Sequence, residues 1–386
     1  MSSLSFIKMA NNNQTNIIIK TVSDYKDLKQ FYQVPFEVYK DNKFWIPPFY
    51  KEFKDFFNPK NIFWTHAEYK LFIVLKDDKI AGRIGAIIDH KYCENLNQKI
   101  GYFGFFECIN DYNCADLLFQ SAQDWLLSKN IEIMRGPIDG RIDITCGFLT
   151  EGFNSSPSLL SNYNPEYYIS FTEKFQMRKV RDFITYYIDL TKPFSQNLKN
   201  NAKECEGSGI SIRSFNRLRT QKELKWWVKF FLESFEDHWG YVPVSEKEVK
   251  SRFGVKQLRW VVDTKLFLIA EDKGMPVAYI WATPDFNQVF KKMNGRLGPF
   301  QLLRFLFDKK QINRGKLHFI GIKKNLRSKG IGSLLNYKAL YEMKKRGYVC
   351  AEVGFIDEKN AVAHSTIAKT GAKPYKRYRI FEKIIK

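Results

Sequence analysis

Short apolar blocks alternate with polar segments along the whole chain, and this pattern predicts a protein of buried strands and amphipathic helices. Apolar runs at residues 71–75 and 317–322 are too short for helices and predict strands. Residues 115–129 instead have apolar side chains every three to four positions, as on one side of a helix. Strands and helices mixed in this way are typical of an α/β protein.

A weak internal repeat divides the chain into two copies. The segment LFIVLKDD at 71–78 resembles LFLIAEDK at 266–273, which lies 195 positions later. Trp45 corresponds to Trp239 at a spacing of 194, and the segment that starts at Lys174 corresponds to the one that starts at Lys369. Three matches at nearly one spacing predict two tandem copies of one domain. The predicted parts are a flexible tail at 1–15, a first domain at 16–190, a linker at 191–209 and a second domain at 210–386.

Length, charge and cysteine usage narrow the classes of function. The chain has 386 residues, more than one ordinary core needs, which agrees with two domains. Its six cysteines and five histidines are scattered, which predicts reduced thiols and no metal site. The net charge of +21 suits nucleic acid, an anionic membrane surface or an anionic substrate, or it reflects nucleotide composition alone. Nucleic acid is the least favoured partner because the basic residues are dispersed.

One stretch combines a strand, a glycine-rich turn and a helix. Strand 317–322 leads into RSKGIG at 327–332, and a helix follows. The glycines let the backbone approach a ligand, and the helix N-terminus directs N–H groups at the same point, which suits a phosphate or pyrophosphate. This pattern, R-x-x-G-x-G, resembles motif A of the GCN5-related N-acetyltransferase (GNAT) superfamily, whose loop holds the pyrophosphate of coenzyme A. The resemblance implies that the coenzyme is bound by Arg327, Ser328, Lys329, Gly330, Ile331, Gly332 and Ser333.

A second motif extends the resemblance. Asn360, Ala363, Lys369 and Gly371 match the spacing N-x-x-A-x5-K-x-G of GNAT motif B, which lies beside the pantetheine arm, so Asn360 is expected to contact the coenzyme. The resemblance implies an N-acyltransferase whose co-substrate is acetyl-CoA or a longer acyl-CoA. In that superfamily an amine attacks the thioester directly, and a backbone N–H of the central strand polarises its carbonyl. By position, Ile322 supplies this N–H.

Two side chains are candidates for the general base. Glu352 lies on the apolar strand 350–355, where a carboxylate is costly unless it is paired or functional. The alternative is that Glu352 only forms an ion pair with Arg377 or Arg379. His318 is the second candidate, although a single histidine on a core strand is more often structural.

The general acid departs from the pattern of the superfamily. A tyrosine commonly stands seven residues after the motif B asparagine, but Ile367 occupies that position here. Tyr378 is the candidate that we name for this role, and the acid is otherwise dispensable or supplied by His364, Ser365 or Tyr375.

The first copy lacks the glycine loop. Its equivalent position reads Asn-Asp-Tyr-Asn at 110–113, and the carboxylate of Asp111 would repel a pyrophosphate. We therefore expect no coenzyme A in this copy. Glu107 is the carboxylate on its central strand, and Tyr163 and Asn164 lie in a loop that either packs on itself or forms a wall of a substrate pocket. The candidate substrate contacts are Glu107, Tyr163, Asn164 and, in the second copy, Trp239.

The second copy contains an insertion at 286–315. Pro299 predicts a helix start, and Phe300, Leu303, Leu306 and Phe307 form an apolar side among lysines and arginines. Such a helix is either a lid packed on the sheet or a surface that touches a membrane or a fatty chain.

Further blocks, such as FGFFE at 103–107 and NYNPEYY at 162–168, resemble a family of tandem GNAT-type bacterial proteins that is loosely similar to the bacterial ceramide synthases. The resemblance implies two GNAT-like domains, each a mixed central sheet flanked by helices, and acyl transfer to an amine, in particular a long-chain sphingoid-type amine. The reduced thiols suit a cytoplasmic protein, and the basic charge and the apolar-basic insertion are compatible with peripheral contact to the inner membrane. The alternatives are an acetyltransferase for a small amine or a peptide, and a non-catalytic acyl-CoA-binding regulator.

Overall fold

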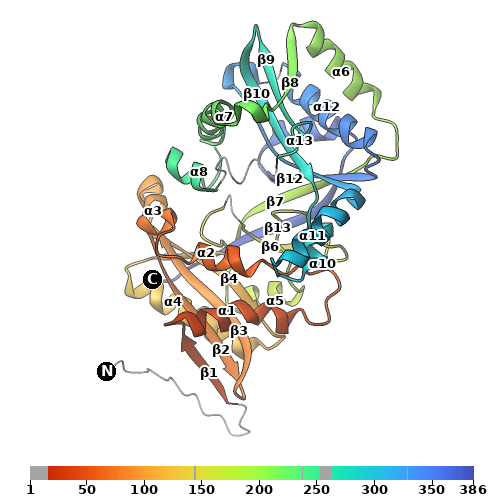
Figure 1. The fold of residues 1–386 in the computed structure, drawn as a ribbon. Helices are drawn as coiled ribbons and strands as arrows, with labels where there is room; N and C mark the ends of the chain where they lie inside the picture. Colours follow the sequence, from red (N-terminus) through yellow and green to blue (C-terminus); the bar gives the residue numbers. More distant parts are fainter. Residues whose placement is uncertain (1–15, 143–144, 237, 253–261, 328) are drawn as a thin grey trace. The chain divides into compact units, whose positions relative to one another are not determined.

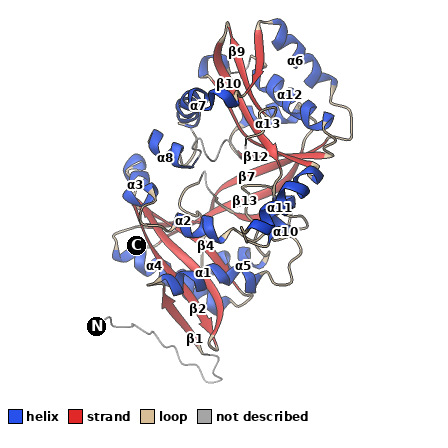
Figure 2. Cartoon of the chain, viewed as in Figure 1, coloured by secondary structure: helices blue, strands red, loops and turns tan. Residues whose placement is uncertain are grey.

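The computed structural model describes residues 16–142, 145–236, 238–252, 262–327 and 329–386 (Figure 1). The chain forms two compact units, each assembled from separate stretches of sequence. Unit 1 contains Met1–Asp182, Met293–Gly298 and Tyr378–Lys386, and unit 2 contains Phe183–Lys292 and Pro299–Arg377. Each unit has a sheet with helices packed against it (Figure 2). The domain boundaries predicted from the repeat stay a prediction.

Unit 1 has a mixed sheet with strand order β1-β2-β3-β4-β5-β13, in which only β4 and β5 are parallel. Its strands are β1 (Ile17–Thr21), β2 (Ala67–Lys76), β3 (Lys79–Asp89), β4 (Ile100–Cys108), β5 (Ile133–Gly136), β6 (Phe148–Glu151) and the end of β13 (Lys373–Ile384). Its helices are α1 (Tyr25–Val38), α2 (Tyr50–Phe56), α3 (His90–Leu96), α4 (Tyr112–Ser128) and α5 (Tyr167–Lys174). A short 3-10 turn covers Ile62–Thr65.

The two faces of this sheet carry separate cores. Phe72 and Val74 of β2 pack with α4, whereas Leu71 and Ile73 pack with α1 and α2. Neighbouring side chains of a strand point to opposite faces, so one amphipathic helix covers one face and the aromatic-rich helices cover the other.

Unit 2 repeats this arrangement with strand order β7-β12-β11-β10-β9-β8, in which only β11 and β12 are parallel. Its strands are β7 (Arg178–Asp189), β8 (Ile210–Ser214), β9 (Phe267–Asp272), β10 (Met275–Pro284), β11 (Arg314–Ile322) and β12 (Cys350–Asp357). Its helices are α6 (Gln196–Gly207), α7 (Thr220–Phe235), α8 (Glu246–Arg252), α10 (Asn287–Met293), α11 (Pro299–Asp308), α12 (Ile331–Lys345) and α13 (Ala361–Ala368). The core around α12 lies on one face, and an aromatic core around α7 lies on the other.

The last strand of each sheet comes from the opposite copy of the sequence. In unit 2, β12 pairs with β7, from Cys350 beside Asp189 to Asp357 beside Phe183. In unit 1, β5 pairs with the end of β13, from Ile133 beside Ile384 to Gly136 beside Phe381. The chain therefore crosses from one unit to the other within both of these strands.

One segment differs from the sequence prediction. Residues 191–209 were expected to be a linker without apolar periodicity, but they contain α6, whose Leu198, Ala202 and Cys205 are buried and which packs on α12. These residues are spaced i, i+4 and i+7 as on a helix face, but alanine and cysteine among many polar residues give a weak apolar signal. None of the helices in the described part of the chain is long and apolar enough to cross a membrane.

Candidate active site

The centre of the unit 2 sheet opens where two parallel strands part. β11 pairs with β12 over only four residues, from Arg314 beside Cys350 to Leu317 beside Val353. Beyond this point β11 continues beside β10, and β12 continues beside β7. Backbone groups of β11 that face this side are therefore not used in the β11–β12 ladder, and a ligand that enters the opening can reach them.

The backbone N–H of Ile322 faces this opening. The next residue, Lys323, donates its N–H to the carbonyl oxygen of Val277 at 3.0 Å, on the β10 side. Backbone N–H groups alternate between the two edges of a strand, so the N–H of Ile322 points to the opposite edge. A fixed donor at this place is what stabilisation of a developing oxyanion requires. That Ile322 polarises the thioester carbonyl stays a prediction, and the direction of its N–H supports it.

The glycine loop forms the N-terminus of α12. Gly330 caps the helix with φ +79°, a backbone conformation that an L side chain rarely adopts. Leu334 donates the first helical hydrogen bond to the carbonyl oxygen of Gly330 at 3.0 Å, which leaves the first-turn N–H groups of Ile331, Gly332 and Ser333 for other partners. The side chains of Ile331 and Ser333 are buried, so these residues would bind a pyrophosphate through the backbone.

Two predicted coenzyme contacts, Arg327 and Lys329, have exposed side chains beside this helix end, and Ser328 lies outside the described residues. Asn360 is the N-cap of α13, where its Oδ1 accepts a hydrogen bond from the N–H of Ala363 at 3.0 Å. A Cβ at Gly332 would lie 3.3 Å from Cγ2 of Thr366, so α13 approaches the start of α12 closely. The two GNAT-like motifs therefore meet at one end of unit 2.

The opposite face of the same strands carries a buried ion pair. Nζ of Lys316 lies 3.1 Å from Oε1 of Glu352, and both residues are about 1% exposed. Their neighbours Leu317 and Val353 belong to the core around α12, so this pair points to the α7 face. Oε2 of Glu352 is also buried and has no hydrogen-bond partner among the described residues. A buried carboxylate oxygen without a donor is expensive unless a ligand supplies one.

Charges around Glu352 decide its protonation state. Burial by itself would raise its pKa, but Lys316, Lys376 and Arg314 together hold the pKa below its usual value, so the group is a carboxylate near neutral pH. Burial lowers the pKa of Lys376 to about 8, although Glu352 opposes this effect. Arg314 pairs with the fully buried Asp285. Lys376 thus titrates closer to neutral pH than an ordinary lysine does.

His318 lies in the same region but is a poor proton acceptor. It is the extra residue of a β-bulge, because Trp281 pairs with Phe319 and Ala282 pairs with Leu317. Its Nε2 lies 2.8 Å from Oγ1 of Thr283. Burial, with a contribution from Lys316, lowers the pKa of His318 to about 3, so the imidazole is neutral and a weak base. The two predicted bases differ in their partners, because Oε2 of Glu352 has none among the described residues whereas Nε2 of His318 is engaged with Thr283.

Tyr378, the predicted acid, belongs to unit 1, where its buried hydroxyl donates to the carbonyl oxygen of Asn162 at 3.3 Å. Sequence reasoning missed Tyr186, which lies on β7 directly beside Val353, in the row where β11 and β12 part. Its hydroxyl is 2.6 Å from Nδ1 of His364. No sequence signal points to Tyr186, because β7 lies at the end of the first copy and joins the sheet of unit 2 only through the strand exchange.

The orientation of this Tyr–His pair follows from its neighbours. Nε2 of His364 lies 3.1 Å from the carbonyl oxygen of Asp357, which can only accept a hydrogen bond. Nε2 therefore carries the proton, and Nδ1 accepts from the hydroxyl of Tyr186. Trp239, a predicted substrate contact, is half-buried with its ring 6.2 Å from that of Phe183, which in turn lies 6.0 Å from Phe355 of β12.

In unit 1 the corresponding opening is filled by the chain itself. β4 pairs with β5 only from Ile100 to Tyr102. The next residues of β4 bond to the following loop instead: Ile138 donates to the carbonyl oxygen of Phe103 at 2.8 Å, and Phe105 donates to Oδ1 of Asp139 at 2.6 Å. A Cβ at Gly104 would lie only 2.3 Å from the carbonyl oxygen of Ile138. Ile138 and Asp139 therefore occupy the edge of β4 that corresponds to the edge of β11 left unpaired by β12.

The helix end of unit 1 is occupied as well. Asp111 caps α4 by accepting from the N–H of Asn113 at 2.9 Å, and it forms an ion pair with Lys76 at 2.6 Å. A carboxylate thus lies where a pyrophosphate would have to bind. This geometry supports the expectation that the first copy binds no coenzyme A.

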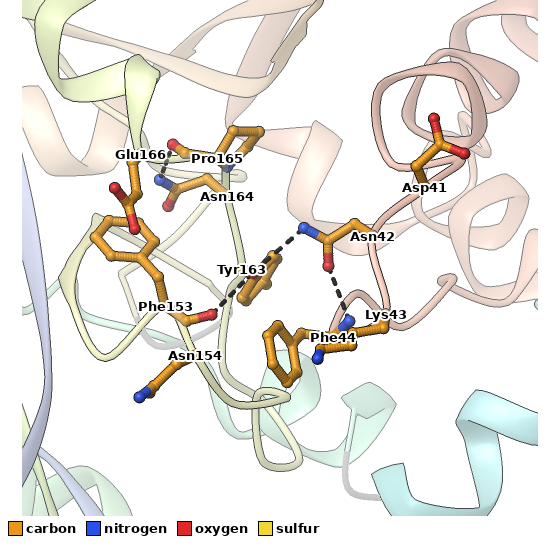
Figure 3. A pocket seen from close by; sticks show the side chains of 10 residues that line it. All are labelled: Asp41, Asn42, Lys43, Phe44, Phe153, Asn154, Tyr163, Asn164, Pro165 and Glu166. Atoms are coloured by element: carbon orange, nitrogen blue, oxygen red, sulfur yellow. Dashed lines mark hydrogen bonds between the residues drawn. The ribbon is translucent and has the colours of Figure 1, made fainter.

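Unit 1 holds a different polar group, centred on Glu107. Its Oε2 accepts hydrogen bonds from the hydroxyls of Tyr39 at 2.7 Å and Tyr168 at 2.8 Å. Burial raises the pKa of Glu107 to about 7, against the opposing effects of Arg83 and the two hydroxyls. The hydroxyl of Tyr39 also lies 3.1 Å from the carbonyl oxygen of Tyr163, which connects Glu107 to the pocket in Figure 3.

This unit 1 pocket has a volume of about 550 Å³. Figure 3 shows Tyr163 between Asn42 and Phe153, and its hydroxyl accepts from the amide of Asn42 at 3.3 Å and donates to the carbonyl oxygen of Phe153 at 2.9 Å. Asn164 is buried in the wall, where its amide bonds to both the N–H and the carbonyl oxygen of Leu149, which is a structural use of that side chain. The lining residues are Asp41, Asn42, Lys43, Phe44, Phe153, Asn154, Tyr163, Asn164, Pro165 and Glu166.

Comparison with known proteins identifies the class. Residues 224–372 match the acetyltransferase (GNAT) family, and this segment contains the glycine loop, the opening between β11 and β12, and Glu352. The fold of the whole chain resembles a tandem GNAT protein from the clavulanic acid biosynthesis pathway, with a TM-score of 0.56 at 10% identity over 97% of this chain and 99% of that one. It also resembles a GCN5-related N-acetyltransferase from Sphaerobacter thermophilus, with a TM-score of 0.53 at 13% identity over 96% of both chains.

Residues 224–372 therefore form a segment of the GNAT acetyltransferase family, whose co-substrate is acyl-CoA, and the chain as a whole has a fold similar to that of tandem GNAT proteins. Two named relatives match it along nearly their whole length. Protein YghO of Escherichia coli (strain K12) is 29% identical over 392 residues and 100% of both chains. The bacterial ceramide synthase of Caulobacter vibrioides (strain NA1000 / CB15N) is 27% identical over 367 residues, which are 93% of this chain and 95% of the relative. The predicted α/β tandem fold is confirmed, and residues 224–372 match the predicted family.

Among the described residues, no group of three or more His, Cys, Asp or Glu side chains is placed to hold a metal ion.

Proposed function

We propose that the protein transfers a long acyl group from acyl-CoA to a long-chain, sphingoid-type amine. The observation that carries the chemistry is Oε2 of Glu352, a buried carboxylate oxygen without a partner beside the parting strands. An amine bound there would donate a hydrogen bond to it. The substrate class draws on the similarity, over 93% of this chain, to the protein named bacterial ceramide synthase.

In the proposed reaction the amine nitrogen attacks the thioester carbonyl carbon. The new C–N bond forms, the C–S bond breaks, and Glu352 takes the proton that the nitrogen loses. The backbone N–H of Ile322 stabilises the oxyanion of the tetrahedral intermediate, and the loop at Gly330 holds the pyrophosphate. Lys316 and Lys376 keep Glu352 ionised, and their positive charge favours an amine that arrives uncharged.

Calorimetric titration with acetyl-CoA and palmitoyl-CoA, below the concentration of micelle formation, tests the acyl preference. Each methylene that the protein buries contributes about 0.8 kcal/mol, so burial of two already strengthens binding about tenfold. We expect palmitoyl-CoA to bind at least tenfold more tightly than acetyl-CoA. Equal affinities would contradict the preference for a long acyl chain and would favour an acetyltransferase for a small amine or a peptide. Binding without turnover of any amine would favour a non-catalytic acyl-CoA-binding regulator.

Two tyrosines are candidates for the acid that protonates the leaving thiolate. Tyr378 is the candidate from the sequence, and Tyr186 is favoured by its position beside Val353 and by its hydrogen bond to His364. We expect Tyr186→Phe to lower kcat by roughly 10- to 100-fold with unchanged acyl-CoA affinity, and Tyr378→Phe to lower it less. Steady-state turnover assays on both variants decide which tyrosine is the acid. A larger loss in Tyr378→Phe would reverse the assignment, and unaffected turnover in both would leave protonation to water.

The predicted substrate contacts Glu107 and Tyr163 in unit 1 and Trp239 in unit 2 stay proposals for each unit by itself, whereas the amide of Asn164 is already used by the backbone of Leu149. The Glu107 carboxyl, with a pKa of about 7, and the aromatic wall of the pocket in Figure 3 suit a molecule with a polar head and an apolar body. The proposal includes a cytoplasmic location and peripheral contact with the anionic inner membrane, because both long-chain substrates partition into lipid.

A further inference from the structure

Helix α11 presents an apolar face that the protein leaves uncovered. None of its ten residues is buried, and Phe300, Leu303 and Phe307 are 71%, 54% and 66% exposed. These three follow one another at i, i+3 and i+7, so they lie on one side of the helix. Leu302 and Leu306, 53% and 51% exposed, widen this stripe. Contiguous exposed apolar surface of this kind is rare on soluble proteins and marks a contact site.

The other side of α11 fixes the helix to unit 2. The ring of Phe305 lies 5.7 Å from that of Phe286 and 6.0 Å from that of Phe290, which lies on α10. Asp308 forms ion pairs with Lys292 at 3.4 Å and with Arg304 at 3.3 Å. Figure 1 shows α10 and α11 beside each other. The helix is thus held by one aromatic side chain and its polar edge, while the apolar stripe faces away from α10.

The charges around the stripe identify its partner. Between positions 291 and 310 the chain has one carboxylate, Asp308, which is engaged by the two cations described above. Against it stand five basic residues of unit 2, which are Lys291, Lys292, Arg304, Lys309 and Lys310, while Arg296 belongs to unit 1. An apolar stripe flanked by cations complements the interface of an anionic bilayer, where acyl chains accept the apolar side chains and headgroup phosphates attract the cations. A second copy of this chain would bring the same positive charges together, which opposes self-association.

We propose that α11 is a membrane-docking helix, which lies in the interface of an anionic bilayer with Phe300, Leu303 and Phe307 inserted among the lipids. The inference names the surface for the peripheral contact in the proposed function, but it depends only on this helix and not on the acyl acceptor.

The test measures co-flotation of the full-length protein with vesicles of phosphatidylcholine and phosphatidylglycerol at low salt. We expect wild-type protein to float with these vesicles, and less with phosphatidylcholine alone. The variant Phe300→Ser/Leu303→Ser/Phe307→Ser is expected to bind these vesicles about tenfold more weakly than the wild type. A control variant, Leu218→Ser/Met275→Ser, removes two isolated apolar side chains that are 98% and 64% exposed, and is expected to float like the wild type.

The electrostatic contribution is tested separately. The variant Lys309→Gln/Lys310→Gln removes two positive charges and should weaken flotation, whereas Lys309→Arg/Lys310→Arg keeps both charges and should float like the wild type. The proposal is overturned if the triple serine variant floats like the wild type, if the wild type floats with neither vesicle, or if the stripe instead mediates a dimer that the triple variant loses in sedimentation experiments. Acyl-CoA affinity in solution, which the triple variant should retain, separates failure of this docking site from failure of the acyltransferase proposal.

Discussion

The substitution Gly330→Asp is expected to abolish measurable acyl-CoA binding, with a loss in affinity of roughly 100-fold or more. Two effects act together. The new carboxylate would lie at the N-terminus of α12, where the pyrophosphate is proposed to bind, and like charges a few ångströms apart repel by about 4 kcal/mol at an effective dielectric constant of 20. The φ of +79° at Gly330 also disfavours any side chain, so the loop would shift. Calorimetric titration with acyl-CoA measures the loss.

The chain supplies a matched control for the backbone effect. Gly347, just after the C-terminus of α12, has φ +81° and open space where a Cβ would be. Gly347→Asp therefore introduces the same charge and a similar conformational strain at the other end of the helix. If this variant loses acyl-CoA affinity as strongly as Gly330→Asp, strain or net charge explains the effect and the glycine loop is not the coenzyme site.

The substitution Glu352→Gln is expected to lower kcat by roughly 100- to 10,000-fold, the range in which general bases act, with little change in acyl-CoA affinity. The amide keeps the shape of the side chain but cannot take the proton of the amine. Steady-state turnover and calorimetry on the same preparation separate these two quantities. Unchanged turnover would remove Glu352 from the mechanism and leave it as the partner of Lys316.

Loss of a buried charge also affects stability, so this variant needs its own control. Glu352→Gln removes the carboxylate of the buried ion pair with Lys316, and breaking a buried pair in comparable cases costs about 3–5 kcal/mol. Asp285→Asn removes the carboxylate that pairs with Arg314 in the same cluster, but Asp285 is not proposed to take a proton from the amine. If both variants lose turnover equally, the cause is a weakened cluster and not a missing base.

The pH dependence of unfolding gives a further distinction. The folded-state pKa of Glu352 lies below its unfolded value, so its contribution to stability is complete above the unfolded pKa of about 4.3 and is lost as the pH falls through the folded pKa. Glu352→Gln should lose this acid-side dependence while it unfolds more easily at neutral pH.

The elements around the coenzyme loop could be predicted because their signals are local. Apolar residues at 317–322, two glycines and a periodic helix together define β11, the loop and α12, and the structure has them at Arg314–Ile322 and Ile331–Lys345. Glu352 could be named because a carboxylate on an apolar strand is unusual. These inferences need only neighbouring residues and their physical preferences.

What could not be predicted depends on contacts between distant residues. Lys316 and Lys376 look like ordinary strand lysines until the sheet brings them to Glu352. Tyr186 lies beside Val353 only because β7 joins the unit 2 sheet, and the opening of that sheet follows from where the pairing of β11 with β12 ends. The sequence contains no local trace of where a strand pair stops. The same applies to α6, whose apolar positions became clear only from its packing on α12.

The exchange of final strands limits how such a chain can evolve. A shortened gene that kept only the second copy would produce a sheet without β7, and the edge of β12 would offer unpaired backbone groups to other chains, a known route to aggregation. Loss of the C-terminal strand would expose β5 in the same way. Removal of either copy would therefore leave the sheet of the other copy incomplete. Selection on one copy would thus also act on the strand that completes the other.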